Sequence, residues 1–230
     1  MLRSVISLLL TLFLPICALA QTEGVVMSWN VENYFDTKDD KSTQDDEFTP
    51  LGARHWSKTR FNNKRNAIAK TIVSVKEFYG DYPFVVGLVE VENRYVLNEL
   101  VENTLLSKLG YGYIHRDSHD PRGIECALLY RKGVFIPVEV KNIEVEKVSY
   151  NKPLKHILYV KGVVADGGDT LHFFVNHWSS KLGGERESEP HRMASSLKVV
   201  SFLDSLANTS SQGGVPKVII MGDLNDTPYS

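Results

Sequence analysis

Short apolar runs rich in β-branched and aromatic residues recur along the chain, and runs of this kind predict β-strands. The predicted strands are Gly24–Trp29, Phe84–Val91, Tyr111–His115, Ile124–Arg131, Val134–Val140, Ile157–Ala165, Leu171–Asn176 and Val218–Met221. Apolar positions at helical spacing predict helices over Asn63–Tyr79, Leu97–Leu109 and Arg192–Leu206. Early strands alternate with helices, whereas residues 111–176 are nearly all strand. The pattern therefore favours a layered α/β protein with partly antiparallel sheets.

Two polar stretches between these elements are predicted as loops. Asp36–Pro50 is rich in aspartate, but it lacks the glycine of an EF-hand, so we expect a solvated acidic loop rather than a calcium loop. Ser179–Pro190 combines Gly183-Gly184 with dense charge and directly follows a strand.

The first 20 residues have the pattern of a secretory signal peptide. Arg3 precedes an apolar run from Val5 to Leu14, and Ala18-Leu19-Ala20 matches a cleavage site. A membrane anchor needs about 20 apolar residues, so we expect no stable membrane insertion. The prediction is export to the periplasm or the medium, cleavage after Ala20, and a single folded domain over residues 21–230.

Composition and charge narrow the choice of function. The chain is 43% hydrophobic and 23% charged, which excludes a wholly disordered or collagen-like protein. With 26 basic and 28 acidic residues its net charge is −2, whereas proteins that hold nucleic acid mainly through phosphates are usually far more basic. A polyanionic substrate must then meet a local positive patch or a metal ion. Cleavage would leave Cys126 as the one cysteine, in an apolar run where a buried side chain is expected.

Four predicted strands end in polar side chains that packing alone does not require. These residues are Asn30, Glu90, the pair Asn176-His177, and Asp223 with Asn225. Each has an ordinary alternative: Asn30 and Asp223 as turn residues, Glu90 as a solvated neighbour of Glu92, and His177 as a satisfied histidine at a strand edge. Taken together they favour a ligand site at strand ends.

The donor types indicate which metal such a site would bind. Carboxylate and amide oxygens suit Mg²⁺, with Mn²⁺ or Ca²⁺ as alternatives. Zinc sites in proteins are usually formed by His or Cys ligands. His115 and His119 are interpreted as loop residues, because no third His or Cys is near them in the sequence.

Five ordered motifs resemble those of the endonuclease/exonuclease/phosphatase superfamily, which has the DNase I-like fold. They are Val26–Asn33, Gly87–Asn93, Arg122–Glu125 leading into Ala127–Arg131, Asn176–Trp178 and Gly222–Asp226. The resemblance is closest to the secreted bacterial branch, which the stretch Phe48-Thr49-Pro50 with His55-Trp56 also fits. It implies a four-layer α/β sandwich, in which two mixed β-sheets pack face to face with helices outside.

The resemblance also implies roles for individual residues. Glu90 matches the principal Mg²⁺ ligand and Asn30 a metal-site position, while His177 matches the histidine that binds or protonates the scissile phosphate. Asp223 matches the carboxylate that orients the attacking water, and Asn225 the amide that holds the phosphate network. The resemblance implies more weakly that Arg122 contacts phosphate and that Glu125 pairs with His177. It also implies that Lys181, Arg186 and Arg192 supply local positive charge.

One departure from the family pattern concerns the end of the chain. Family members have a late Asp-His pair whose histidine is an acid/base partner, and no such pair follows Asp223. The resemblance therefore implies that the last strands of the second sheet are absent, and we expect a fragment of a longer protein rather than a truncated member.

The resulting expectation is a secreted, Mg²⁺-dependent phosphoesterase that acts as a monomer. Nucleic acid is the leading substrate on family grounds, with phospholipid head groups and sugar or inositol phosphates as alternatives. The rival from another class is a non-catalytic binding protein on the same scaffold.

Overall fold

The computed structural model describes residues 24–118, 120–148, 154–209 and 215–227. The predicted signal peptide, its cleavage after Ala20, and His119 lie outside the described residues. The strands are β1 (Val26–Tyr34), β2 (Val85–Val91), β3 (Tyr111–His115), β4 (Glu125–Arg131), β5 (Phe135–Ile143), β6 (Ile157–Val164), β7 (Thr170–His177) and β8 (Lys217–Asp223). The α-helices are α1 (Lys58–Tyr79), α2 (Arg94–Glu102) and α3 (Glu185–Thr209).

The strands form two mixed sheets of four strands each. The first has the order β1-β2-β4-β3 and the second β5-β6-β7-β8. β1 runs parallel to β2, and β7 runs parallel to β8, while all other neighbours are antiparallel. The parallel pairs place the ends of β1, β2, β7 and β8 at one end of the molecule.

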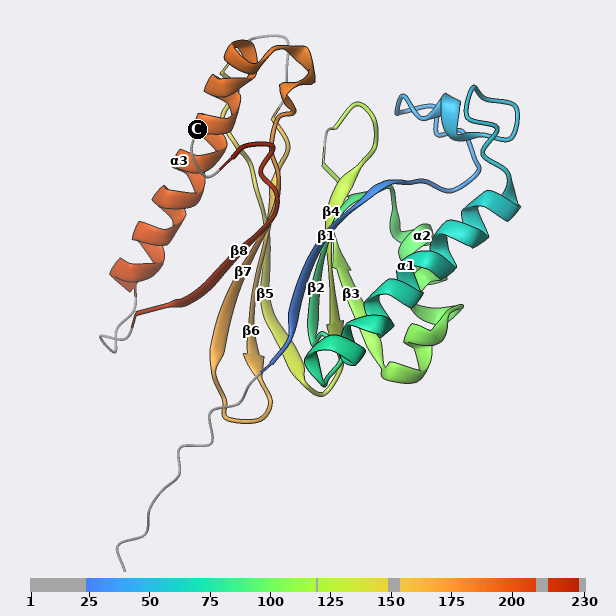
Figure 1. Ribbon diagram of the computed structural model, residues 1–230. Coiled ribbons are helices and arrows are strands. Elements are labelled where there is room, and N and C mark those ends of the chain that lie inside the picture. Colours follow the sequence, from blue (N-terminus) through green and yellow to red (C-terminus); the bar gives the residue numbers. More distant parts are fainter. Residues whose placement is uncertain (1–23, 119, 149–153, 210–214, 228–230) are drawn as a thin grey trace, which may run out of the picture.

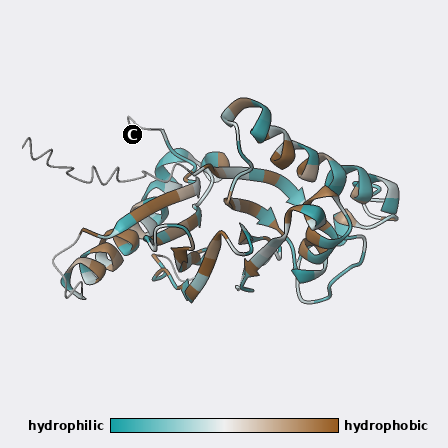
Figure 2. Ribbon diagram, turned by 90° about the horizontal axis from the view of Figure 1, so that it is seen from below, coloured by the Kyte–Doolittle hydropathy of each residue, from teal (hydrophilic) through white to brown (hydrophobic). Residues whose placement is uncertain are grey.

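The two sheets pack face to face, with α1 and α2 outside the first sheet and α3 outside the second (Figure 1). Successive side chains along a strand point to opposite faces of the sheet, so apolar strands contribute to the core on both faces. Leu158 and Val160 of β6 face the other sheet, whereas Ile157 and Tyr159 face the core beside α3. Hydrophobic segments accordingly run along the central strands (Figure 2). The predicted four-layer α/β sandwich is confirmed.

A glycine in β2 leaves room for a methionine side chain between the sheets. A Cβ atom at Gly87 would lie 2.8 Å from the Cε of Met221 in β8. Without that atom, the Met221 side chain fills the space between the two sheets.

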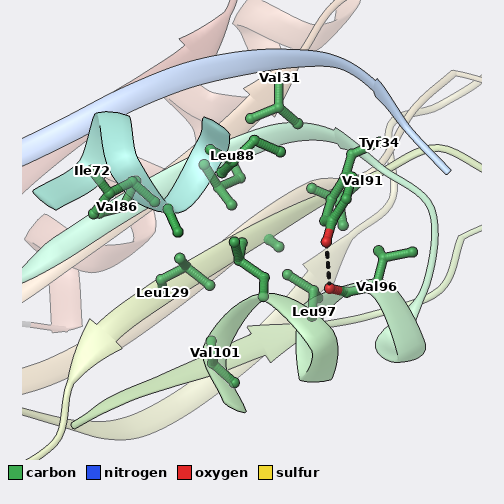
Figure 3. Packing of buried hydrophobic residues seen from close by; sticks show 14 of the residues in the cluster. Val31, Tyr34, Ile72, Val86, Leu88, Val91, Val96, Leu97, Val101 and Leu129 are labelled. Carbon is green, nitrogen blue, oxygen red and sulfur yellow. Dashed lines mark hydrogen bonds between the residues drawn. The ribbon is translucent and has the colours of Figure 1, made fainter. Parts of the chain in front are cut away.

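The apolar core between the first sheet and the helices α1 and α2, here called the outer core, contains a buried hydrogen bond. Tyr34 of β1 lies beside Val91, in the cluster that also contains Leu88 and Ile72 (Figure 3). Its hydroxyl donates a hydrogen bond of 3.0 Å to the carbonyl of Val96 in α2. The bond links the end of β1 to the first turn of α2, and satisfies a buried hydroxyl.

The predicted helices overlap the observed ones but differ from them at their ends. α1 begins at Lys58 because the Ser57 side chain accepts a hydrogen bond from the Arg60 amide, which caps the helix. The predicted helix Leu97–Leu109 is instead α2, capped by Asn93, followed by a separate 3₁₀ turn.

The predicted loop Ser179–Pro190 is wrong in its second half, because α3 begins at Glu185 and contains Pro190. The predicted helix Arg192–Leu206 lacks the first seven residues of α3 and its last three, Ala207–Thr209. Residues 185–191 are charged or polar apart from Pro190, so no apolar periodicity marks this first part of the helix.

The acidic stretch Asp36–Pro50 is a loop, as predicted, but it is not fully solvated. Asp36 is 7% exposed and Asp45 1% exposed. The Asp45 carboxylate accepts hydrogen bonds from the Asp40 amide. Backbone donors rather than solvent therefore satisfy its most buried carboxylate.

Two further predictions concern single features. Cys126 is buried in the core between the sheets, as expected, and burial raises the pKa of its thiol to about 12. Among the described helices, none combines the length and apolar character that crossing a bilayer requires.

Candidate active site where the two sheets meet

Side chains from both sheets meet where β1, β2 and β8 end. The Asn30 amide nitrogen donates a 3.2 Å hydrogen bond to Oε1 of Glu90 and a 2.9 Å bond to Oδ2 of Asp223. Glu90 belongs to the first sheet and Asp223 to the second. Asn30 therefore holds two carboxylates from different sheets beside each other, while its own oxygen accepts from the Glu32 amide.

A β-bulge directs the Glu90 side chain. Val89 pairs with Cys126 and Val91 with Glu125, so Glu90 is left without a partner in the ladder. Val89 lies in the core between the sheets and Val91 in the outer core, although residues two apart share a face in a regular strand. Glu90 has a φ of 66°, and such a conformation in a non-glycine residue costs about 1–3 kcal/mol and is typical of functional sites.

The Glu90 carboxylate is held by the end of the neighbouring strand β1. Oε2 of Glu90 accepts a 2.8 Å hydrogen bond from the backbone amide of Asn33. Asn33 itself has a φ of 63°. The sequence analysis did not give Asn33 this role, because a backbone donor leaves no signal in residue type.

His177 ends β7 and is 4% exposed. Its Nε2 lies 3.6 Å from Oε1 of Glu90, and the Nζ of Lys155 lies 2.9 Å from its Nδ1 and 3.0 Å from its Nε2. Burial, together with the positive charges of Lys155 and Arg122, lowers the pKa of His177 to about 2. The imidazole is therefore neutral at physiological pH.

Lys155 is the cation of the site, and the sequence analysis missed it. Burial lowers the pKa of Lys155 to about 8, so the ammonium group is still charged at pH 7. Lys155 lies in the segment before β6, where a single lysine has no distinctive spacing. Its contact with His177 is visible only after β6 and β7 pair.

The second sheet fixes Asp223 and Asn225 through local hydrogen bonds. Oδ1 of Asp223 accepts from the Asn225 amide at 2.9 Å, and the Asn225 side-chain nitrogen donates to the carbonyl of Trp178 at 2.9 Å. Asn225 has a φ of 49°. The segments after β7 and β8 are thereby joined, with both carboxylate oxygens of Asp223 engaged.

Asn176 supports this arrangement from inside the sheet. It is fully buried, and its side-chain nitrogen donates to the carbonyls of Phe174 and Met221. Its oxygen accepts from the indole nitrogen of Trp178. Asn176 thus positions neighbouring residues, while His177 faces the site.

Three predicted phosphate-site residues lie around this centre with other partners. Glu125 accepts hydrogen bonds from the Ser118 amide and hydroxyl, so the expected pairing with His177 is replaced by one with Ser118. Burial raises the pKa of Glu125 to about 7.

Arg122 is exposed, and its Nε lies 3.9 Å from Oδ1 of Asp120. Its positive charge is close enough to lower the pKa of His177. Lys181 contacts Glu185 and Asp226.

The expected positive patch is also partly neutralised. Arg192 is buried and pairs with Asp226 at 2.7 Å. Because Lys181 binds the same carboxylate, Lys155 and Arg122 carry the positive charge nearest His177.

A cavity of about 580 Å³ opens at this point and is lined by Asn30, Lys181, Asp223 and Asn225, together with neighbours in the segment after β8. Within the described residues, no group of three or more His, Cys, Asp or Glu side chains is arranged to hold a metal. Mg²⁺ usually takes one or two protein carboxylates and completes its shell with water and substrate phosphate. Glu90 and Asp223, which share the Asn30 amide, fit that requirement.

Comparison with known proteins was made on sequence and on fold. The family model "Endonuclease/Exonuclease/phosphatase family" matches residues 25–230. A search among curated proteins found no match.

Several solved structures share the fold. The human Nocturnin catalytic domain with bound sulfate is 19% identical, with a TM-score of 0.57, covering 89% of this chain and 65% of that one. TDP2 from C. elegans is 19% identical, with a TM-score of 0.56 and coverage of 89% and 48%. A mannosyl-6-phosphatase from Bacteroides thetaiotaomicron is 19% identical, with a TM-score of 0.60 and coverage of 89% and 66%.

The chain thus spans about half to two thirds of the length of these structures. Similarity at this level of identity shows the shared fold, and the family model covers nearly all of the described residues. The chain belongs to the endonuclease/exonuclease/phosphatase family.

Proposed function

We propose that this protein is a divalent-metal-dependent phosphoesterase whose site is formed by Asn30, Glu90, Lys155, His177 and Asp223. The observation that carries the proposal is the pair of hydrogen bonds from one Asn30 amide to Glu90 and Asp223, which belong to different sheets. Two carboxylates held side by side beside a half-buried cation suit a metal and a phosphate group together.

Glu90 and Asp223 would hold the metal, with Asn30 fixing their separation. A bound divalent cation polarises a phosphoryl oxygen and stabilises the charge that develops on it. The bulge at Glu90 and the bond from the Asn33 amide keep this carboxylate in place before substrate arrives. Such preorganisation reduces the cost of reorganisation during reaction.

The remaining residues act on water and on the phosphate. Asp223, whose oxygens are oriented by Asn30 and Asn225, aligns a water for in-line attack on phosphorus and accepts its proton. The P–O bond opposite the water breaks, and the leaving oxygen departs as the free alcohol or phenol after taking a proton from solvent. Neutral His177 donates a hydrogen bond to a phosphoryl oxygen. Lys155 supplies the positive charge next to it.

This chemistry acts on the phosphate group that nucleic acid, phospholipid head groups and sugar or inositol phosphates all carry. Selection among them depends on the surface beside the phosphate site. Hydrolysis of a nucleic-acid phosphodiester remains the expectation from the family resemblance. Export through the N-terminal segment remains a prediction, checked by N-terminal sequencing of protein recovered outside the cytoplasm.

The proposal is tested with a generic ester, bis(p-nitrophenyl) phosphate, in the presence of Mg²⁺. We expect release of p-nitrophenol that stops with EDTA and resumes with added Mg²⁺. Glu90→Gln and Asp223→Asn should each lower kcat/KM at least about 100-fold, as expected when a group that stabilises transition-state charge is removed. Glu139→Gln, on β5 at the far edge of the second sheet, is the control and should keep full activity.

Turnover that persists in EDTA, or in Glu90→Gln, would contradict the proposed mechanism. The rival function, a binding protein on the same scaffold, predicts a different outcome: phosphate binding that depends on Lys155, without turnover of any ester.

A further inference from the structure

A second cavity adjoins the proposed phosphate site. This cavity, here called the α3 pocket, measures about 570 Å³ and lies between the first turns of α3 and the segment after β8. Leu224, Asp226 and Thr227 line both the α3 pocket and the cavity beside Asp223. Figure 1 shows the chain after β8 passing beside α3. A substrate with its phosphate at Asp223 can therefore place its organic group in the α3 pocket.

The wall between the two cavities is fixed by a network of ions. Asp226 binds the Nζ of Lys181 through Oδ1 and the Nε of Arg192 through Oδ2, each at 2.7 Å. Arg192 is 4% exposed and also donates to the Ser188 hydroxyl at 2.6 Å. These contacts hold the wall in place, and they occupy the charges of Lys181 and Arg192.

The charge of the lining disfavours a second phosphate. Three carboxylates, of Glu185, Glu189 and Asp226, line the α3 pocket against the guanidinium groups of Arg186 and Arg192. A nucleic-acid strand carries a negative charge on every nucleotide. Lys181 and Arg192 are already paired with two of these carboxylates, so the next phosphate of such a strand would meet no net positive charge that could hold it.

The groups left for a ligand are the guanidinium of Arg186, the carboxylate of Glu189, the hydroxyl of Ser196 and an apolar surface. No hydrogen bond or ion pair joins the side chain of Arg186 or Glu189 to another described residue, and both side chains are exposed at the pocket. They lie three positions apart on α3, so they are neighbours on the helix surface. Trp178 and Met193 contribute ring and thioether surface.

This combination suits an uncharged ring that carries several hydroxyl groups. A hydroxyl donates to a carboxylate and accepts from a guanidinium group, so neighbouring hydroxyls can satisfy Glu189 and Arg186 together. The C–H face of such a ring packs against apolar surface such as that of Trp178 and Met193.

We propose that the α3 pocket binds the uncharged sugar group of a monophosphorylated substrate whose phosphate lies beside His177 and Lys155, at the metal site of Glu90 and Asp223. The inference rests on the proposed function for the position of the phosphate. It names the substrate class: sugar phosphates rather than polynucleotides.

The test is calorimetric binding of two kinds of ligand in the presence of Mg²⁺. Methyl phosphate probes the phosphate site alone, and a panel of hexose 6-phosphates of gluco, galacto and manno configuration probes both cavities. We expect the best hexose phosphate to bind at least fivefold more tightly than methyl phosphate. The double variant Arg186→Gln/Glu189→Gln, which keeps the net charge, should bring the ratio close to one and leave the affinity for methyl phosphate unchanged.

Glu187→Gln, on the same helix but outside the pocket lining, is the matched control and should keep the wild-type ratio. Equal binding of both ligands by wild type, an unchanged ratio in the double variant, or tighter binding of a dinucleotide than of any hexose phosphate would overturn the inference while leaving the phosphate site intact. If neither ligand binds, the phosphate site itself is wrong, and the inference falls with it.

Discussion

The Nζ of Lys155 contacts both ring nitrogens of His177, at 2.9 Å and 3.0 Å. The two residues come from the segment before β6 and from the end of β7, which are neighbouring antiparallel strands. A half-buried ammonium group next to a neutral imidazole gives the site a positive charge that titrates near pH 8.

This contact predicts a pH-dependent affinity for anions. Sulfate keeps its charge between pH 7 and 9.5, so any change in its binding reports on the protein. Burial holds the pKa of Lys155 at about 8, so Lys155 loses its charge as pH rises through that value, and sulfate binding should weaken several-fold. Lys155→Met should bind sulfate at least tenfold more weakly at pH 7. Lys155→Arg should keep binding with little dependence on pH, because arginine stays protonated throughout this range. Calorimetry is the measurement, and a wild-type affinity that is constant across the range would contradict the role of Lys155.

Glu125 predicts a pH dependence of stability. Burial raises the pKa of this carboxyl from 4.5 to about 7, which means that the folded state favours the protonated form. The stabilisation is then complete below pH 4.5 and is lost as pH rises through about 7. Glu125→Gln removes this loss and can still accept from Ser118. The variant should melt about 2–4 °C above wild type at pH 8, corresponding to about 1 kcal/mol, and should match wild type at pH 4.5. Thermal unfolding at the two pH values checks this, and a constant difference between the two proteins would refute it.

The hydroxyl of Tyr34 should contribute measurably to stability. Tyr34→Phe removes a buried hydrogen bond to the Val96 carbonyl, which costs about 0.5–1.5 kcal/mol in the free energy of unfolding. Tyr113→Phe removes an exposed bond to Asn98 and should change stability by no more than about 0.5 kcal/mol. Urea denaturation of both variants gives the comparison. Equal effects would mean that burial does not decide the value of these bonds.

Gly222 should be the least replaceable of the glycines near the site. A Cβ atom there would lie 2.0 Å from the backbone oxygen of Asn176, and its φ is 120°. Gly222→Ala should therefore destabilise the fold by more than about 3 kcal/mol. Gly80 also has a positive φ, but a Cβ there would meet nothing within 4 Å. Gly80→Ala should cost only about 1–2 kcal/mol. Denaturant midpoints that rank the two variants in the opposite order would contradict this account of the β7–β8 junction.

Much of the fold can be predicted from the sequence because its strands have strong apolar patterns. Each of the eight predicted strands overlaps an observed one, and β2 is buried on both faces, as an uninterrupted apolar run indicates. Helix starts are less predictable, since they depend on single capping residues such as Ser57 and Asn93.

The site is predictable only in part, for physical reasons. Asn30, Glu90, His177 and Asp223 stand out because polar residues follow apolar strands, and the structure brings them together. Lys155 and the Asn33 amide enter the site through strand pairing and a β-bulge, which no local pattern specifies. The partners of Glu125 and Lys181 likewise depend on how the surrounding loops fold back.

The most direct test of the central claim is Mn²⁺ binding, followed by electron paramagnetic resonance, in wild type and Glu90→Gln. Mn²⁺ is a spectroscopic substitute for Mg²⁺ at oxygen-rich sites. The proposed site predicts one Mn²⁺ per chain, displaced by Mg²⁺, and at least tenfold weaker binding in Glu90→Gln, while Glu139→Gln binds as wild type does. Identical binding curves for wild type and Glu90→Gln would contradict the claim that a metal is held between Glu90 and Asp223.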